Sequence, residues 1–375
     1  MRPDTSPLCC RHLRCRPTGE ASRGWQSRTT VLVSISTFQK KKMTDSSHSS
    51  KEEYPNSGLV FAADLGGTHL RAAIINEKGR IHFRLKQDTP AAEKPEDIVR
   101  ALVLAVGECE RQSSAAGQRI SAVSVVVPGV VCVETGVVLK APNLPCLDGF
   151  GLTAALAEVL GRPAILENDA NAAAVGEMWQ GAGRGRHTIV CVTLGTGVGG
   201  GLILNGKLWR GVNGSAAEIG HMSVDPFGGV ACTCGSRGCL EVYASATAIV
   251  RMTREARPRH PDSVLTAKQD LTSKEIYRAG VAGDELAIEV FRRMGVYLGI
   301  GLANLINILN PEMIVIGGGV VNGWELFAKD MNHQVAERAF PLPASKVKIV
   351  PGECGDDAGL LGAVRLAFTA THESA

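Results

Sequence analysis

The chain has 375 residues, of which 45% are hydrophobic and 21% charged, so it is long enough to form two lobes with cores of their own. Residues 1–42 hold nine Lys or Arg and two Asp or Glu and carry +7, whereas the remaining residues carry −4 of the net charge of +3. The body therefore shows no basic bias toward nucleic acid, and no apolar run reaches the roughly 20 residues that span a bilayer.

The N-terminal region differs in composition from the rest. Residues 1–57 lack sustained hydrophobic periodicity and are rich in Arg, Ser, Thr and Lys, which predicts a disordered extension. Met43 follows three lysines and is a candidate alternative start, which would make the upstream stretch a start-site artefact. A basic interaction tail is the alternative interpretation.

Strands and helices are expected to alternate from Gly58 onward. The expected strands are 59–64, 70–76, 81–86, 120–128, 163–169, two strands around a glycine turn within 188–206, one beginning at 311, and 347–351. The expected helices are 95–112, 151–160, 170–180, 241–256, 273–281, 283–308, one after the glycine turn that ends the strand at 311, and 357–369. This alternation predicts α/β lobes with mixed sheets. The strand–glycine turn–strand units 59–76 and 188–206 suggest two similar lobes built on related hairpins.

Glycine turns in these two hairpins are suited to binding phosphates. Asp64 precedes Gly66-Gly67-Thr68, where backbone N–H groups could approach a phosphate closely and the carboxylate could hold Mg²⁺ through water. The segment 194–201 forms a second such loop, which matches neither a P-loop nor a dinucleotide-binding loop that opens a helix. A third glycine turn, 317–319, could support an adenosine. Each turn could instead be an ordinary hairpin.

Asp169 lies where a predicted strand meets a predicted helix. One interpretation makes it a general base that takes a proton from an alcohol during phosphoryl transfer. The alternative makes it the N-cap of the helix. Asn143, Glu218, His221 and Glu241 offer amide, carboxylate and imidazole groups that suit the hydroxyls of a sugar, although isolated glutamates more often lie on a solvated surface.

A cluster of thiols follows His221. Cys232, Cys234 and Cys239 lie within 19 residues of that histidine, and His/Cys₃ is a common structural zinc set. Gly235 and Gly238 would let the chain turn tightly between the last two thiols. Three packed, inert thiols are the alternative. The other cysteines form no disulfide framework, which favours a reducing, cytoplasmic location.

Taken together, these motifs resemble those of the ROK family (repressors, open reading frames, kinases) of the actin/hexokinase-like ATPase superfamily. The resemblance covers about residues 58–370 and rests on DLGGTHLR, VPGVV, PNLP, ENDANAAA, TLGTGVGGG, AEIGH, CTCGSRGCLE and IVIGGG. It implies a two-lobed α/β (ribonuclease H-like) ATPase fold with the active site in a cleft between the lobes. The expected small lobe is 58–168 plus 356–375, and the large lobe is 169–355 with a zinc loop at 221–241.

The resemblance also implies roles for individual residues. Asp169 would be the catalytic base. Sugar-binding residues would be Gly129, Asn143, Asn168, Asp169, Glu218, His221 and Glu241. ATP-binding residues would be Asp64, Gly66, Gly67, Thr68, His69, Thr196 and Gly197, with Gly318 and Gly319 from the third glycine turn. Zinc ligands would be His221, Cys232, Cys234 and Cys239. His69 departs from the family, where Asn or Lys is frequent, so ATP affinity is expected to differ.

The expected activity is that of an ATP- and Mg²⁺-dependent hexose kinase acting on the 6-hydroxyl group of glucose, since the residues of the motifs are most like those of bacterial glucokinases. Kinases for N-acetylmannosamine, N-acetylglucosamine or fructose share nearly all the motifs and remain alternatives. A sugar-responsive repressor is a further one, but residues 1–57 show no pair of amphipathic helices that would form a helix-turn-helix. A homodimer or homotetramer is implied, with no nucleic-acid or membrane partner.

Overall fold

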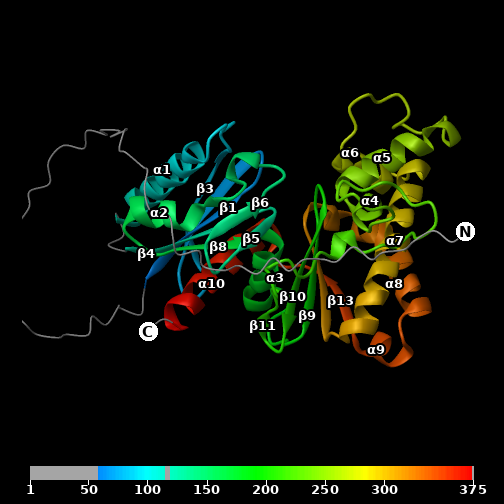
Figure 1. Ribbon diagram of the computed structural model, residues 1–375. Coiled ribbons are helices and arrows are strands. Elements are labelled where there is room, and N and C mark those ends of the chain that lie inside the picture. The colour runs from blue at the N-terminus through cyan, green and yellow to red at the C-terminus, as the bar shows by residue number, and fades with distance from the viewer. Residues whose placement is uncertain (1–57, 115–118, 374–375) are drawn as a thin grey trace, which may run out of the picture. The chain divides into compact units, whose positions relative to one another are not determined.

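The computed structural model describes residues 58–114 and 119–373 (Figure 1). The predicted disordered extension and the candidate start at Met43 lie outside the described residues. The described residues fall within one compact unit, Tyr54–Ala375. The proposed boundaries between a small and a large lobe within it stay a prediction.

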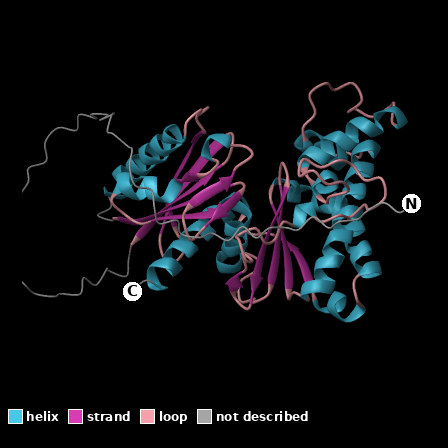
Figure 2. Cartoon of the chain, viewed as in Figure 1, coloured by secondary structure: helices cyan, strands magenta, loops and turns pink. Residues whose placement is uncertain are grey.

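Two five-stranded mixed sheets organise the fold (Figure 2). The first has the order β3-β2-β1-β4-β8 and the second β11-β10-β9-β12-β13. In each, the opening hairpin is antiparallel, a third strand extends its outer edge, and two parallel strands follow on the other side. The strands are β1 (Leu59–Leu65), β2 (His69–Ile75), β3 (Ile81–Asp88), β4 (Ile120–Val127), β8 (Ala164–Asn168), β9 (Ile189–Leu194), β10 (Val198–Leu204), β11 (Lys207–Leu208), β12 (Met313–Gly317) and β13 (Lys348–Pro351). The prediction of two related hairpins is thereby confirmed, while the two lobes stay a prediction.

Apart from α9 (Pro341–Lys346), which the sequence does not predict, the helices form in the segments where it predicts them. They are α1 (Pro95–Ser114), α2 (Leu152–Leu160), α3 (Asp169–Gln180), α4 (Glu241–Ala244), α5 (Ala246–Ala256), α6 (Ser273–Val281), α7 (Glu285–Leu309), α8 (Trp324–Arg338), α9 (Pro341–Lys346) and α10 (Ala358–Glu373). The expected continuous helix 241–256 is wrong. It breaks at Ser245, whose extended backbone (φ −85°, ψ 164°) lets its side chain cap the N-terminus of α5 by accepting from Ala248 N–H at 3.0 Å.

A small third sheet escapes the sequence pattern. It contains β5 (Val130–Cys132), β6 (Val137–Lys140) and β7 (Phe150–Gly151), in that order. Strands of two to four residues are too short to show a period of two, so nothing in the sequence distinguishes them from loop. This sheet places Gly129 and the Pro-Asn-Leu-Pro turn beside the first sheet.

Helices α3 and α10 pack together at two glycines. A side chain at Gly176 would meet the backbone of Ala358, and one at Gly362 would meet that of Ala172. The apolar face of α10 packs on the first sheet, whereas Ala174 and Val175 of α3 pack with the second. The start of α3 is therefore held by both sheets.

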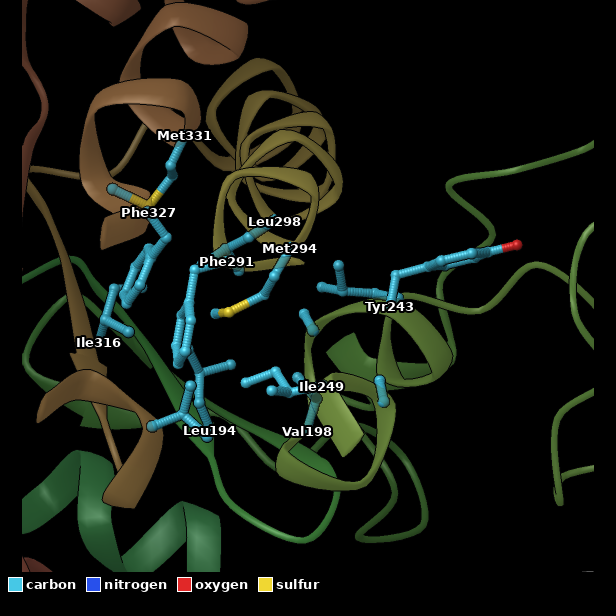
Figure 3. Packing of buried hydrophobic residues seen from close by; sticks show 14 of the residues in the cluster. Leu194, Val198, Tyr243, Ile249, Phe291, Met294, Leu298, Ile316, Phe327 and Met331 are labelled. Carbon is cyan, nitrogen blue, oxygen red and sulfur yellow. The ribbon is translucent and has the colours of Figure 1, made fainter. Parts of the chain in front are cut away.

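The largest buried cluster lies beside the second sheet. Figure 3 shows Phe291, Met294 and Leu298 of α7 facing Leu194 and Ile316 of the sheet, with Phe327 and Met331 of α8 completing the cluster. Burial of such large side chains contributes roughly 1.5–3 kcal/mol each and fixes the helices against the strands. In the described part of the chain, no helix combines the length and the apolar character that crossing a membrane requires.

Candidate active site and metal centre

The junction of β8 and α3 presents the predicted base. Asn168 is the N-cap, with extended backbone (φ −71°, ψ 145°) and a side-chain oxygen that accepts from the N–H groups of Ala170 at 2.9 Å and Asn171 at 3.0 Å. Asp169 is the first residue of the helix. The interpretation of Asp169 as the N-cap is therefore wrong, because its neighbour has that role and leaves the carboxylate available.

The Asp169 carboxylate is oriented and poorly hydrated. Its Oδ1 accepts from Asn168 Nδ2 at 3.1 Å and from Ala170 N–H at 2.9 Å. Burial, reinforced by the nearby charge of Asp64, raises the pKa of Asp169 from 3.8 to about 6, and the hydrogen bonds oppose that rise. A carboxylate with a pKa near 6 is ionised at neutral pH yet basic enough to take a proton in a reaction.

Asn168 is a predicted sugar ligand, but its side chain is already occupied. Its oxygen accepts two helix N–H groups, and its nitrogen donates to Asp169 and, at 2.9 Å, to the carbonyl oxygen of Gly129. All four hydrogen-bonding positions of the amide are thus used. Gly129, also a predicted sugar ligand, is brought against the catalytic junction by this bond.

The first glycine hairpin carries charge. Asp64, at the end of β1, is ion-paired with Arg71 across the hairpin at 3.2 Å, and Arg71 reaches Asp356 at 3.5 Å. Burial raises the pKa of Asp64; Arg71 opposes this and Asp356 adds to it. A site that keeps a carboxylate poorly hydrated in this way suits a cationic ligand.

The loop of this hairpin is tied down by its own neighbours. Gly66 N–H donates to the His69 carbonyl at 3.0 Å, and Thr89 binds the carbonyls of Gly66 (2.6 Å) and Thr68 (2.9 Å). A side chain at Gly67 would lie 2.9 Å from Cβ of Asn143, so the predicted phosphate loop and the predicted sugar ligand Asn143 are adjacent. The exposed imidazole of His69 pairs with Asp88 at 3.1 Å.

The second glycine loop is held from outside. Ala246 N–H donates to the Gly195 carbonyl and the Thr247 hydroxyl to the Thr196 carbonyl, both at 2.8 Å. The carboxylate of Glu241, a predicted sugar ligand, accepts from Val198 N–H at 3.0 Å and lies against Gly197. Of the third glycine turn, Gly318 packs on the backbone of Leu194, and Gly319 opens a short 3₁₀ helix.

Three consecutive glycines of β10 serve packing. Side chains at Gly199 and Gly201 would lie 2.8 Å and 2.5 Å from the methyl groups of Ala170 and Ala174 in α3. On the opposite face, one at Gly200 would strike Ile219 and the carbonyl of Ala217. Since successive strand residues face opposite sides, these glycines let α3 and the segment before His221 contact both faces of one strand.

His221, Cys232, Cys234 and Cys239 come together as predicted. Their ligand atoms all lie within 4.8 Å of one another, with Cys234 Sγ 3.7 Å from Cys239 Sγ and Cys232 Sγ 3.7 Å from His221 Nδ1. Tetrahedral zinc would place two thiolates about 3.8 Å apart and a thiolate about 3.6 Å from an imidazole nitrogen. The four residues therefore fit a structural zinc ion. Gly235 and Gly238 have φ of +91° and +72°, as the tight turns require.

The other nitrogen of His221 faces a carboxylate. His221 Nε2 lies 4.0 Å from the half-exposed carboxylate of Glu218. Ala217, immediately before Glu218, has a left-handed backbone (φ +65°) that is unusual for a residue other than glycine.

The loop that follows is anchored by Tyr243. Its hydroxyl, pointing away from the core in Figure 3, donates to Asp225 at 2.8 Å and accepts from Val230 N–H at 3.0 Å.

Comparison with known proteins places this arrangement in a family. The model of the ROK family matches residues 60–370. The chain belongs to the ROK family. It is 38% identical to a glucokinase of Halalkalibacterium halodurans over 303 residues, 80% of this chain and 92% of that protein.

Solved structures agree in fold. A ROK family glucokinase from Streptomyces griseus in complex with glucose and AMPPNP is 35% identical, with a TM-score of 0.72 over 83% of this chain and 100% of that one. A ROK family transcriptional regulator is 28% identical, with a TM-score of 0.75 over 82% of this chain and 76% of that one. The chain thus has the actin/hexokinase-like α/β fold of ROK sugar kinases.

Three residues that organise the site of this ROK protein have no role in the prediction from sequence. Glu167 is 1% exposed and paired with Arg210 at 2.7 Å, and Arg71 pairs with Asp64. Arg71 belongs to the quoted DLGGTHLR motif and Glu167 to ENDANAAA, and the position of Glu167 at the buried end of a strand could have marked it as a residue needing a partner. Nothing in the sequence points to Arg210, which lies 43 residues away.

Proposed function

We propose that this protein is an ATP- and Mg²⁺-dependent hexose kinase that phosphorylates the 6-hydroxyl of glucose, in the predicted cleft between its lobes. The observation that carries the proposal is the oriented Asp169 carboxylate, with a pKa of about 6, close to the charged end of the first glycine hairpin. Similarity to glucokinases supports a ROK sugar kinase and favours glucose over the N-acetylated hexoses and fructose.

In this mechanism Asp169 accepts the proton of the 6-hydroxyl as the hydroxyl oxygen attacks the γ-phosphorus, and the bond from that phosphorus to the bridging oxygen breaks, so that ADP leaves. Bonds from Asn168 and Ala170 to Oδ1 hold the carboxylate and leave Oδ2 to face the substrate. Because the pKa lies about one unit below neutral pH, most of the enzyme is in the basic form. Positioning and charge neutralisation then account for most of the rate, as phosphoryl transfer requires.

The two hairpins would bind the triphosphate from different sides. Asp64 would hold the Mg²⁺ of MgATP through water, and the backbone of Gly66, Gly67 and Thr68 would donate to phosphate oxygens. Thr196 and Gly197 would contribute from the second hairpin, with Gly318 and Gly319 beneath the adenosine. Gly67 touches Asn143, so phosphate and sugar groups would meet there.

Sugar hydroxyls would be held by residues on both sides of Asp169. Gly129 and Asn143 come from the small sheet side, and Glu218, His221 and Glu241 from the zinc loop side. His221, Cys232, Cys234 and Cys239 would hold zinc, which supplies a rigid crosslink of the loop and no reacting atom. Asn168 would orient the base in addition to any sugar contact.

The test is a hexose panel with wild-type enzyme and Asp169→Asn. We expect glucose to be the best of glucose, mannose, fructose, N-acetylglucosamine and N-acetylmannosamine. Asp169→Asn should lose about 10²–10⁴-fold in kcat, because the base is gone, while calorimetry still detects sugar binding. Asp330→Asn, on the remote helix α8, is the matched control and should keep normal turnover. Near-normal turnover by Asp169→Asn would refute the base assignment, and preference for another hexose would refute glucose.

A sugar-responsive regulator is the second candidate, favoured by the TM-score of 0.75 with a ROK transcriptional regulator. Sugar-dependent binding to DNA in a shift assay, together with no turnover on any hexose, would establish it over the kinase. We also propose a homodimer or homotetramer, which light scattering of the full chain would measure.

A further inference from the structure

A buried ion pair joins the catalytic junction to the segment that leads to Glu218. The Glu167 carboxylate, 1% exposed, accepts three hydrogen bonds. Its Oε1 accepts from Asn168 N–H and from the Asn171 side-chain amide, both at 3.0 Å. Its Oε2 accepts from Nε of Arg210 at 2.7 Å and is ion-paired with a terminal nitrogen of the same guanidinium, also at 2.7 Å. One oxygen thus serves the start of α3, and the other serves a residue of a distant loop.

Arg210 also organises its own loop. Its carbonyl accepts from Ala216 N–H at 3.1 Å, which closes the turn 210–216. The next residues are Ala217, with its left-handed backbone, and Glu218. Within the same turn, Gly214 packs against the carbonyl of Val131 in the small sheet. The position of Glu218 is therefore set by a turn whose first residue is anchored to Glu167.

We propose that Arg210 is a positioning residue that, through Glu167, holds the base Asp169 and the sugar-binding segment at Glu218 in one fixed arrangement; this rests on the proposed function. A guanidinium suits the task because two of its nitrogens bind one carboxylate oxygen, whereas a lysine offers a single point of charge. The glycine loops that would bind ATP are held by other residues: Thr89 binds the first loop, and Glu241 and Thr247 bind the second.

This arrangement predicts a selective kinetic defect. Misplacement of reacting groups by about 1 Å costs roughly 10²-fold in rate. Arg210→Met should therefore lower kcat by about 10²-fold and raise KM for the sugar by about tenfold, with KM for ATP within about twofold of wild type. Arg210→Lys, which keeps the charge, should recover about tenfold of the lost kcat.

Two further variants separate positioning from folding. Arg210→Met alone leaves a buried, uncompensated carboxylate, so E167Q/R210M removes both charges; its glutamine oxygen can still accept from Asn168 and Asn171. The control is Arg162→Met, a partly buried arginine that precedes β8, at the opposite end of this strand from Asp169, and is paired with Glu110 at 2.7 Å. It should lower the midpoint of thermal unfolding without altering either KM.

Hydrogen exchange supplies a readout that does not depend on turnover. The amide of Ala216, which closes the turn that Arg210 anchors, should exchange at least about tenfold faster in E167Q/R210M than in wild type, and its exchange should be unchanged in Arg162→Met. Unchanged exchange, or kinetics in which kcat and both KM values change together, would overturn the positioning role. Wild type that phosphorylates no hexose would refute the proposed function, whereas the exchange result would still decide whether Arg210 holds the two segments.

Discussion

The two glycine hairpins share a strand order but are built for different tasks. In the first, β1 and β2 bring the opposing charges Asp64 and Arg71 together, and Thr89 ties the loop. In the second, Thr193 occupies the position of Asp64, two residues before the first glycine, and faces Gly199 across the ladder. One hairpin concentrates charge at its tip; the other has a bare backbone against which other segments pack.

Support of the loops differs in the same way. The first loop is held by bonds from its own sheet, since Thr89 directly follows β3. The second is held by Glu241, Ala246 and Thr247, which follow the proposed zinc ligand Cys239 in the chain. The two hairpins thus share a topology without sharing a role. The first would bind a charged ligand, and the second would position groups that neighbouring segments contribute.

Among substitutions within the two hairpins, the largest loss of kcat is expected when the charge of the first hairpin is removed. Asp64→Asn should lower kcat by about 10²–10³-fold, because the carboxylate proposed to hold Mg²⁺ is lost. Thr193→Val, at the matching position of the second hairpin, should change kcat by less than about threefold. Steady-state assays at saturating MgATP and glucose would measure both.

The thermal stability of Asp64→Asn should rise, although its activity falls. Burial raises the pKa of Asp64, so its ionised form destabilises the fold at neutral pH, and Asp64→Asn should unfold at a higher temperature at pH 7. This gain should vanish at a pH low enough to protonate the wild-type carboxylate. Equal kinetic losses in both variants would break the contrast between the hairpins.

Removal of the proposed zinc ion should loosen the second hairpin and leave the first unchanged. Stripping zinc frees Cys239 and so loosens Glu241, two residues later, which binds Val198 of the second hairpin. Amides near Val198 should exchange about tenfold faster or more after chelation, whereas those between Gly66 and Leu70 should not change. Added zinc should restore the protection. Equal loosening of both loops would show that the zinc loop acts on the whole fold.

The features that could be predicted from the sequence are those formed by residues close together in the chain. The thiol cluster needs only 19 residues, and the buried strand 59–65 and helix 357–369 are marked by continuous or periodic apolar residues. The glycines of β10 were expected to belong to a phosphate-binding turn, yet they are packing sites. A run of glycines predicts a close approach to the backbone but does not say whether a ligand or another segment approaches.

The features that could not be predicted involve residues that are far apart in the sequence or lie at uncertain element boundaries. Glu167 and Arg210 are separated by 43 residues, and only the fold brings them together. The assignment of the N-cap to Asn168 was equally hidden, because Asn and Asp are both favoured caps and stand side by side. Which of the two is the cap depends on where β8 ends, and a strand boundary is uncertain by more than one residue from sequence alone.

Methyl groups added to the two hairpins should have smaller, unequal effects. In Gly200→Ala the new Cβ would meet the carbonyl of Ala217 and the side chain of Ile219, so the free energy of unfolding should fall by about 1–3 kcal/mol or more. In Gly67→Ala it would meet Cβ of Asn143 at 2.9 Å and the carbonyl oxygen of Asn143 at 3.2 Å, so the backbone of that exposed turn would have to move, and the loss should be about 1 kcal/mol, smaller than at Gly200. Denaturant titration measures both; a larger loss at Gly67 would contradict the view that the second hairpin is the packing site.

The smallest expected effect is a displacement along the pH axis. Asp169 must be ionised to accept a proton, so kcat/KM should fall as the pH drops through about 6, the pKa to which burial and Asp64 raise it. Asp64→Asn removes the neighbouring negative charge, which lowers the pKa of Asp169 and moves this limb toward lower pH. The raised pKa of Asp64 itself would contribute to the same limb, so its loss acts in the same direction. Thr193→Val should leave the limb near pH 6. If the acidic limb of kcat/KM stays near pH 6 in Asp64→Asn, the charge of Asp64 does not influence the base. The two hairpins would then differ only in how other segments pack against them.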